Sequence, residues 1–337
     1  MINHTQNGVS SKRYGCLALM TMGLYVGLGL TVSAPDAFAI GFTLGDAANY
    51  AVIYQAGGSN QLGINNGPGL NGLAVNGNIG IDNTSPNNGK LQLSGPLVLN
   101  SNVDFAGTYT QGTQDNGPYS GNIQVNGTIS GGHANVHADM LYLNNLSTTL
   151  GGEAGTSVAL NTGATISGAS GTLDAFGDRV FTVSGISAPN GTLTINGDGI
   201  SKVVFNISAA ANGNFHFNSI VLGGGLTSDD VLFNFFGGTN ATLTGGPTLD
   251  INSNGTTLFG TFLDPNGMIS ITHSILDGRI FGGDTHNMQI VSGALINAPP
   301  NVPDNGSTAM LLGLAVVGLG CVSRKFQVHQ ALSSARK

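Results

Sequence analysis

Three residues in the middle of the chain could bind a metal ion: His133, His137 and Asp139. Imidazole nitrogens and carboxylate oxygens are common zinc ligands. Gly131-Gly132 and the surrounding β-type pattern argue against a helix here, so we expect a strand. In a strand the three side chains point the same way, which makes coordination geometrically possible. Solvated surface histidines are the simpler interpretation of the same pattern.

Acidic turns make calcium a second candidate ion. Asp198 lies in the segment Asn196-Gly197-Asp198-Gly199, and Asp229 and Asp230 follow Ser228. Such turns supply the hard oxygen ligands that Ca²⁺ prefers outside the cell. Neither segment has the EF-hand spacing or the repeated Gly-Asp nonapeptide of calcium-binding coils. We therefore expect no cofactor, with a structural calcium ion as the alternative.

Common catalytic motifs are missing from the sequence: it contains no G-x-S-x-G, no H-E-x-x-H and no Walker loop. Gly67-Pro68-Gly69-Leu70-Asn71-Gly72 matches G-x-G-x-x-G, but turn sequence follows it where dinucleotide binding needs a helix. Asp229 and Asp230 are adjacent and would face opposite sides of a strand. Arg279 beside Asp277 is interpreted as a surface ion pair. We predict that the chain is not an enzyme, with a β-helix polysaccharide-active enzyme as an alternative.

The composition of residues 40–301 restricts the class of partner. Both cysteines, Cys16 and Cys321, lie outside this stretch, so no disulfide can stabilise it. It contains fifteen of the 17 acidic residues and only four lysines and arginines. So acidic a chain does not bind nucleic acid by counterion release. Glycine is abundant, with 54 in 337 residues, about twice the usual ~7%.

Short alternating apolar runs recur along this stretch and predict strands with one buried face. Turn pairs such as Asn76-Gly77, Asn126-Gly127 and Asn196-Gly197 punctuate the sequence, and their residues tolerate positive φ. We expect an all-β domain: an irregular β-solenoid with Asn-Gly at its corners, or alternatively a β-sandwich. The predicted strands are 91–93, 97–99, 123–125, 193–195, 203–207, 215–217 and 269–271.

The N-terminus has the features of a signal peptide. Lys12 and Arg13 precede an apolar stretch over residues 16–32, and Ala37 and Ala39 occupy the positions that signal peptidase reads. We predict a signal peptide over residues 1–39 with cleavage after Ala39. A retained N-terminal membrane anchor is the alternative.

A sorting tail is predicted over residues 299–337. A short polar signature precedes a hydrophobic segment, 308–323, that a basic pair closes. The segment is somewhat shorter than the roughly 20 residues that span a bilayer comfortably, which fits a transient inner-membrane helix. The tail resembles the PEP-CTERM signal in its V-P-D-x-G-S-T variant, which exosortase systems of Gram-negative bacteria process. The residues that carry the resemblance are Val302, Pro303, Asp304, Gly306, Ser307, Thr308, Arg324 and Lys325.

Residues 40–298 form the predicted exported domain, and its motifs resemble a group of bacterial surface proteins. The segment 44–52 is similar to the opening of "choice-of-anchor A" domains and equally to that of ice-binding β-solenoid proteins. Residues 203–207, 223–226 and 231–235 resemble the first family, as do 260–267 and 276–283. Within one of these strands, Asn234 either points inward and bonds to the neighbouring coil or is exposed.

This resemblance implies an adhesive module of the cell surface or extracellular matrix. The tail implies processing by signal peptidase and an exosortase, with a transient stay in the inner membrane. Such tails accompany exopolysaccharide production, so an extracellular polysaccharide or another surface ligand is the expected partner. Ice binding is a further alternative, although Thr108-Tyr109-Thr110 and Thr242-Leu243-Thr244 are isolated and form no ladder.

Overall fold

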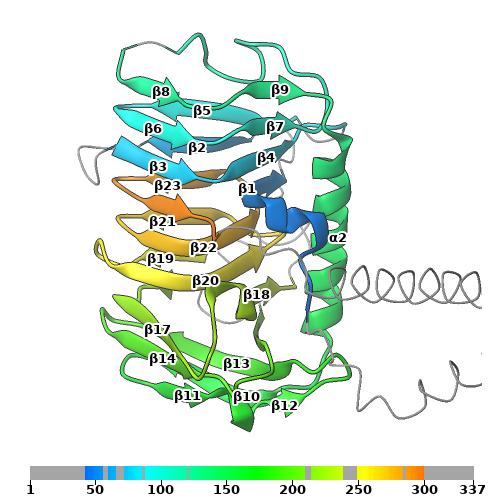
Figure 1. Cartoon of the computed structure of the whole chain (residues 1–337), viewed down its shortest axis with the longest axis vertical. Helices are drawn as coiled ribbons and strands as arrows, with labels where there is room; N and C mark the ends of the chain where they lie inside the picture. Colours follow the sequence, from blue (N-terminus) through cyan, green and yellow to red (C-terminus); the bar gives the residue numbers. More distant parts are fainter. Residues whose placement is uncertain are drawn as a thin grey trace, which may run out of the picture.

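The computed structural model describes residues 42–55, 60–65, 72–85, 88–119, 121–208, 214–237, 249–283 and 286–299. In these residues, short parallel strands wind into a solenoid with three walls, and one long helix runs along one of them (Figure 1). The predicted solenoid is confirmed. The signal peptide and the sorting tail lie outside the described residues. No helix within the described ranges is long and apolar enough to cross a membrane.

Each wall is a stack of strands from successive coils. The helix wall comprises β10 (Thr156–Asn161), β13 (Arg179–Ser187), β15 (Val203–Ser208), β18 (Val231–Phe236), β20 (Thr257–Asp264), β22 (Ile275–Gly282), β1 (Tyr50–Gln55), β4 (Asn78–Asp82), β7 (Val103–Phe105) and β9 (Ile129–Gly131). The short β12 (Thr172–Leu173) pairs with β13, and unlike the other described pairs it runs antiparallel.

The second wall, which we call the asparagine wall, has two parts. One is a three-stranded sheet, β11 (Thr165–Ser167), β14 (Thr192–Asn196) and β17 (Ser219–Gly223). The other contains the first halves of β20 and β22, then β24 (Leu295–Asn297), β3 (Leu73–Asn76), β6 (Leu97–Asn100) and β8 (Ile123–Val125). The third wall is β16 (Asn214–Phe215), β19 (Leu249–Asn252), β21 (Ile269–Thr272), β23 (Met288–Val291), β2 (Gln61–Asn65) and β5 (Lys90–Ser94).

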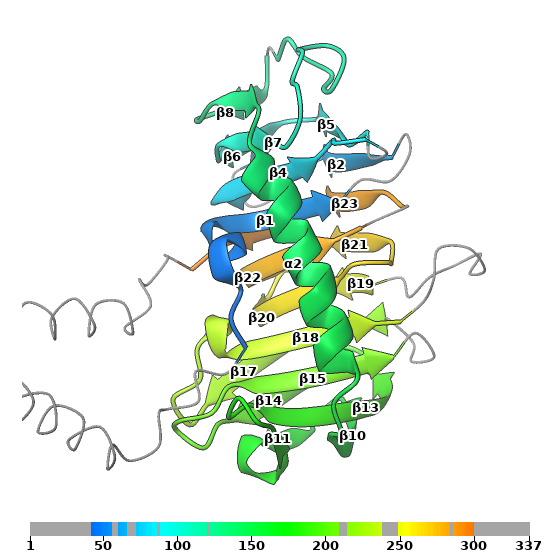
Figure 2. The same cartoon turned by 90° about the vertical axis from the view of Figure 1, so that its right-hand side faces the viewer.

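The coils are not stacked in sequence order. β1 pairs with β22 on one side and β4 on the other, so the first coil lies against the last one, in the middle of the stack. From there the chain builds coils up to β9. The helix α2 (Ala134–Gly151) then carries it about 27 Å back to the other end, at 1.5 Å for each of its 18 residues. Figure 2 shows α2 lying across the helix wall from end to end.

Stacked aromatic side chains fill the core of the lower coils. Phe181, Phe205, Phe233 and Phe262 occupy successive strands, and their ring centroids are 5.2, 5.2 and 4.8 Å apart. These distances follow from the spacing of parallel strands, about 4.8 Å, because each residue lies directly above its counterpart. The core therefore depends on exact register between coils, which the pairs Phe181↔Phe205 and Phe205↔Phe233 show directly.

The predicted Asn-Gly corners are present. Asn76 ends β3 and Asn78 begins β4, with Gly77 between them at a φ of 128°. A Cβ atom on Gly77 would lie 2.9 Å from the Cβ of Ala298 and 3.0 Å from that of Ala51. The corner therefore needs glycine for both conformation and space.

The helix α2 is a correction to the sequence analysis, which predicted a strand at its beginning. Its buried side chains recur every three to four residues along one face: Val136, Asp139, Met140, Leu143, Ser147 and Leu150. The remaining η elements are single short turns, η1 (Gly45–Asn49), η3 (Gly168–Ser170) and η4 (Ser228–Asp230).

Two stacked asparagines fix α2 on the helix wall. Asn234 is buried and bonds to the neighbouring coil as predicted, with its Nδ2 donating to Asn206 Oδ1 at 2.9 Å. Its side chain nevertheless points out of the coil toward α2, on the same face of β18 as Leu232, and the predicted inward orientation is wrong. Ser147 Oγ donates to Asn234 Oδ1 at 2.6 Å, and Asn234 Nδ2 also donates to the Ser147 carbonyl at 3.0 Å. Asn206 donates to the carbonyl of Leu150. These bonds hold the C-terminal half of the helix against β15 and β18.

Candidate functional site

The asparagine wall carries a column of polar side chains that repeats from coil to coil. Its members occupy matching positions on neighbouring strands: Asp277, Asn297, Asn76, Asn100 and Asn126. Asn76 Nδ2 donates to Asn297 Oδ1 at 2.7 Å, as Asn126 Nδ2 does to Asn100 Oδ1. Asn297 Nδ2 donates to Asp277 Oδ1 at 3.1 Å. Because each coil adds one amide, the wall presents hydrogen-bonding groups at the strand spacing.

Below Asp277 the regular column ends, and β20 places Phe259 in that register position. The first half of β20 pairs with β22 on one edge, and β17 pairs with β14 on its far edge. Within the described residues, no ladder joins β17 to β20, although the two strands are neighbours. The wall therefore has a gap between two strand edges.

The segment between β17 and β18 shapes this gap. Gly224 and Gly225 adopt positive φ, 63° and 85°, and turn the chain into η4. A capping box stabilises η4: Asp230 Oδ2 accepts from the amide of Thr227 at 2.8 Å and from its hydroxyl at 2.6 Å. The result is a groove of about 570 Å³, which we call the β17–β20 groove.

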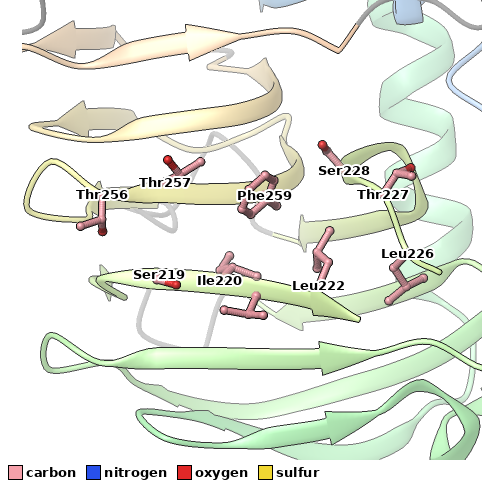
Figure 3. A pocket seen from close by; sticks show the side chains of 10 residues that line it. Ser219, Ile220, Leu222, Leu226, Thr227, Ser228, Thr256, Thr257 and Phe259 are labelled. Atoms are coloured by element: carbon pink, nitrogen blue, oxygen red, sulfur yellow. The ribbon is translucent and has the colours of Figure 1, made fainter. Parts of the chain in front are cut away.

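Apolar side chains and hydroxyl groups line the β17–β20 groove. Figure 3 shows Phe259 on β20 above Ile220 and Leu222 on β17, with Leu226 at one end. The hydroxyl groups come from Ser219, Thr227, Ser228, Thr256 and Thr257. The volume lies within the roughly 300–1,000 Å³ of small-ligand sites, and apolar walls with a few polar groups are typical of them.

Asp229, at one end of the groove loop, forms an ion pair with Arg279. The side chain of Arg279 is 1% exposed, so the sequence-based interpretation of a surface pair with Asp277 is wrong. Arg279 also donates to the carbonyl of Ala48 at 3.1 Å and to that of Pro299 at 3.1 Å. One guanidinium thus joins η1, η4 and the end of the described chain.

The two histidines of the predicted metal cluster have separate partners. His133 precedes α2 and lies 2.9 Å from Ser130 Oγ. His137 Nδ1 is 2.7 Å from Asp82 Oδ2 and 3.0 Å from Thr84 Oγ1. The strand that would have aligned their side chains with Asp139 is a helix, so the geometric basis of that prediction was wrong.

Asp139 faces a different environment, on the buried side of α2. Burial, and then the charge of Asp46, raise its pKa to about 6. One of its carboxylate oxygens, Oδ2, has no hydrogen-bond partner. The residue is therefore a poorly satisfied buried acid rather than a member of the predicted cluster.

The predicted calcium loops have internal partners. Asp198 accepts from the amides of Ile200 at 3.1 Å and Ser201 at 2.7 Å and pairs with Arg179 Nε at 2.9 Å. Despite some burial, these contacts lower its pKa. Asp229 and Asp230 lie in the short turn η4, where Asp229 pairs with Arg279 and Asp230 accepts from the amide of Thr227. In the described part of the chain, no three His, Cys, Asp or Glu residues are arranged to hold a metal ion.

The groove was not found from the sequence. Its strands, 219–223 and 257–259, were not among the predicted strands, and the missing ladder depends on contacts between separate coils. The only local signal is the run Gly223-Gly224-Gly225 followed by Thr227-Ser228-Asp229-Asp230. Such a run interrupts a regular coil and marks a place where the wall changes.

This geometry defines a class of protein: a parallel β-solenoid with a column of polar side chains on one wall and a groove in that wall. Residues 37–292 match the family described as "Putative Ice-binding-like adhesive domain", and residues 301–326 match the VPDSG-CTERM motif. The chain belongs to this family of ice-binding-like adhesive domains. The predicted PEP-CTERM-type signal is confirmed, and together the motif and the domain indicate an exported cell-surface protein.

Several solved ice-binding proteins are similar to the chain. One from an Arctic yeast is 18% identical, with a TM-score of 0.47, and the match covers 79% of this chain and 96% of that one. One from the Antarctic ascomycete Antarctomyces psychrotrophicus is 14% identical, with a TM-score of 0.46 and coverages of 77% and 100%. One from an Antarctic bacterium of the Flavobacteriaceae is 19% identical, with a TM-score of 0.48 and coverages of 78% and 48%. No curated protein matches the chain.

Proposed function

We propose that this chain is a non-enzymatic adhesive module that captures extracellular polysaccharide in the β17–β20 groove. The observation that carries the proposal is the gap in the asparagine wall, where Phe259 replaces the asparagine column beside two strand edges. An aromatic ring stacks on the C–H face of a sugar, while hydroxyl groups and strand edges bond to its hydroxyls. The choice-of-anchor A resemblance and the sorting tail support this role.

The charges around the groove favour a neutral glycan. Asp277 lies beside Phe259 in register, and η4 contributes Asp230, while the charge of Asp229 is balanced by Arg279. The chain carries a net charge of −7. Carboxylates accept hydrogen bonds from sugar hydroxyls but repel uronic acids and sulfated sugars. For the same reason nucleic acid is not a partner of this surface.

The predicted signals at the two termini direct export of the protein to the cell surface. Signal peptidase removes residues 1–39, and the hydrophobic segment of the tail holds the chain in the inner membrane until an exosortase acts on the VPDSG-type motif. The protein then reaches the cell surface or the extracellular matrix, where it contributes to biofilm cohesion. The match to the sorting motif supports this route.

A glycan array probed with the exported full-length protein tests the binding role. We expect selective capture of neutral polysaccharides and at least about tenfold weaker binding by Phe259→Ala, the loss of one stacking contact. Phe176→Ala is the matched control, since Phe176 is 55% exposed in a loop outside the groove, and it leaves binding unchanged. If both variants bind glycan equally well, the groove is not the binding site. If sugar cleavage products appear, the protein is an enzyme and the non-enzymatic role is wrong.

Ice binding is a second candidate because one part of the wall resembles the required surface. In the three-stranded sheet, Thr165 lies in register with Thr194, and Thr192 with Ser219. The next position beside Thr194 is Val221, so the hydroxyl pattern ends after two strands. An ice-recrystallisation assay distinguishes ice binding from glycan capture. Ice binding is favoured if the protein inhibits recrystallisation, Thr194→Tyr abolishes the inhibition and Phe259→Ala leaves it intact.

A further inference from the structure

A polar pocket separate from the β17–β20 groove lies beside β5, near the upper end of the stack in Figure 1. Its volume is about 290 Å³, just below the roughly 300–1,000 Å³ typical of drug-sized ligands, so it has room for a single sugar unit. Its side chains are polar, whereas those of the groove are largely apolar. We call it the Lys90 pocket, and its lining residues are Asn83, Asn88, Gly89, Lys90, Thr113 and Gln114.

Lys90 supplies the pocket with an unpaired positive charge. Among the described residues, the other cations have partners: Arg179 and Arg279 each form an ion pair with an aspartate, and Lys202 donates to a backbone carbonyl. Lys90 begins β5 with its side chain exposed, and no acceptor within the described ranges contacts its ammonium group. This charge is therefore available to an anionic ligand.

The acidic residues of the neighbouring coils are engaged elsewhere. Asp82 is 1% exposed, and its Oδ2 lies 2.7 Å from His137 Nδ1. Asp115 accepts from the hydroxyl groups of Tyr109 at 2.8 Å and Tyr119 at 3.0 Å, and from two backbone amides. Neither carboxylate lines the pocket. The lining thus carries one positive charge and no negative charge, although the chain as a whole has a net charge of −7.

Hydrogen bonds hold the other walls of the pocket in place. Asn83 Oδ1 accepts from the amide of Gly107 at 2.6 Å, and its Nδ2 group donates to the carbonyl of Thr108 at 2.8 Å. Gln114 Oε1 accepts from the amide of Thr110 at 2.7 Å, which fixes this side chain. The Nε2 group of Gln114 has no acceptor in the described part of the chain. The pocket therefore offers an amide donor that is ordered before a ligand arrives.

An ammonium donor and an amide donor with a single positive charge between them match a carboxylate. A carboxylate has two acceptor oxygens and carries one negative charge. Lys90 Nζ and Gln114 Nε2 supply one donor for each oxygen. The side chains of Asn88 and Thr113 supply donors and acceptors for the hydroxyl groups of a sugar. Together these groups have the chemistry that recognises a uronic acid.

We propose that the Lys90 pocket binds the carboxylate of a uronic acid unit in an acidic polysaccharide. A charge-assisted hydrogen bond from Lys90 supplies most of the attraction, and Gln114 orients the carboxylate. This site goes beyond the proposed function, because its charge preference is opposite to that of the β17–β20 groove. With the groove on the asparagine wall and this pocket on the third wall, one molecule joins a neutral glycan to an acidic one.

A ligand-observed NMR titration of the exported full-length protein with trigalacturonate tests the proposal. The methyl ester of the same trimer is the matched neutral ligand, and a chelator prevents calcium from bridging the sugar to aspartates. We expect the acid to bind with a Kd on the order of 1 mM and the ester at least about fivefold more weakly. Raising NaCl from about 0.05 M to about 0.5 M should remove most of this difference, because salt screens an exposed charge pair.

Three variants and a matched control assign the preference for the acid to the pocket. Lys90→Gln removes the charge and should make the acid and the ester bind equally, whereas Lys90→Arg keeps the charge and the preference. Phe259→Ala weakens capture of neutral glycan in the groove and leaves the preference for the acid intact. Gln289→Ala, at an exposed position of β23 on the same wall, is the control and leaves the preference unchanged. Lys90 is exposed, so its replacement does not disturb folding.

Three outcomes overturn the proposal. One is equal affinity of the wild type for the acid and the ester. Another is a preference for the acid that Lys90→Gln retains, because the charge would then be recognised elsewhere. The third is a preference that disappears in Phe259→Ala, because the uronic acid would then occupy the β17–β20 groove.

Discussion

The protein uses stacked asparagines in two regions, and the regions differ in burial and in purpose. Asn206 and Asn234 lie beneath α2 and are almost completely inaccessible, while Asn76, Asn100 and Asn126 face solvent on the asparagine wall. The buried pair bonds to Ser147 and Leu150 of the helix. The exposed amides bond to one another. The same repeat thus positions a helix in one place and forms an exposed column of hydrogen-bonded amides in the other.

Burial decides the energetic contribution of each region. A buried polar group that loses its partner costs the full desolvation penalty, about 1–3 kcal/mol, whereas an exposed one exchanges its partner for water. The helix-wall asparagines therefore determine where α2 docks, and the wall column can vary with little effect on stability. Four substitutions, from the largest expected effect to the smallest, test this contrast.

Replacing the buried cation has the largest expected effect. Arg279→Met leaves the carbonyls of Ala48 and Pro299 without their donor and leaves Asp229 without its ion pair. We expect a loss of about 3–5 kcal/mol in the free energy of unfolding, measured by urea denaturation. Arg179→Met is the control, since Arg179 is more exposed and its loss costs less. Equal losses for both would contradict the assigned importance of burial.

The second-largest loss of stability is expected from replacing a member of the buried asparagine pair. Asn234→Ala removes the bonds to Asn206 and Ser147 and leaves a small cavity. We expect the free energy of unfolding to fall by about 2–4 kcal/mol and amide exchange in the C-terminal half of α2 to become faster. If hydrogen exchange across α2 stays unchanged, the asparagine pair does not position the helix.

Asp139 tests the same principle through pH. Its folded pKa is about 6, above its ordinary value of 3.8, so the folded state holds this proton more tightly than the unfolded state does. Stability therefore falls as the pH rises from about 4 to 6, and the penalty persists above that range. Asp139→Asn should raise the free energy of unfolding by about 1–3 kcal/mol at pH 7 and change it little at pH 3. A pH-independent gain would contradict this origin.

The smallest effect is expected on the asparagine wall. Asn100→Ala removes one exposed acceptor from Asn126 and should lower the free energy of unfolding by less than about 1 kcal/mol. The measurement is the urea midpoint, compared directly with that of Asn234→Ala. A loss as large as that of the buried variant would erase the distinction between the two regions.

Much of the fold follows from local patterns. Alternating strands and Asn-Gly corners predicted the solenoid because each coil repeats the same local chemistry. The helix was missed because Asp139 and Ser147 interrupt its buried stripe, while Leu141 and Tyr142 are half-exposed on the opposite side. The spacing of Val136, Met140, Leu143 and Leu150 nevertheless carries a helical period.

The candidate site depended on long-range arrangement. The sequence does not reveal that β1 pairs with β22, or that β17 and β20 are neighbours without a ladder. Arg279 was paired with the nearby Asp277, but its partner is Asp229, fifty positions earlier. The partner inferred from closeness in sequence was wrong because successive coils bring residues that are distant in sequence together.

The position of β24 has a mechanical consequence for a tethered protein. β24, the last strand in the described residues, lies between β22 and β3 and runs parallel to both. Two residues beyond it, the carbonyl of Pro299 accepts a hydrogen bond from Arg279. A pull on the tail would act along β24 and load both ladders in shear, so their bonds resist together instead of opening one after another. A domain anchored by this end would withstand drag from flow better than one whose final strand could be peeled from an edge.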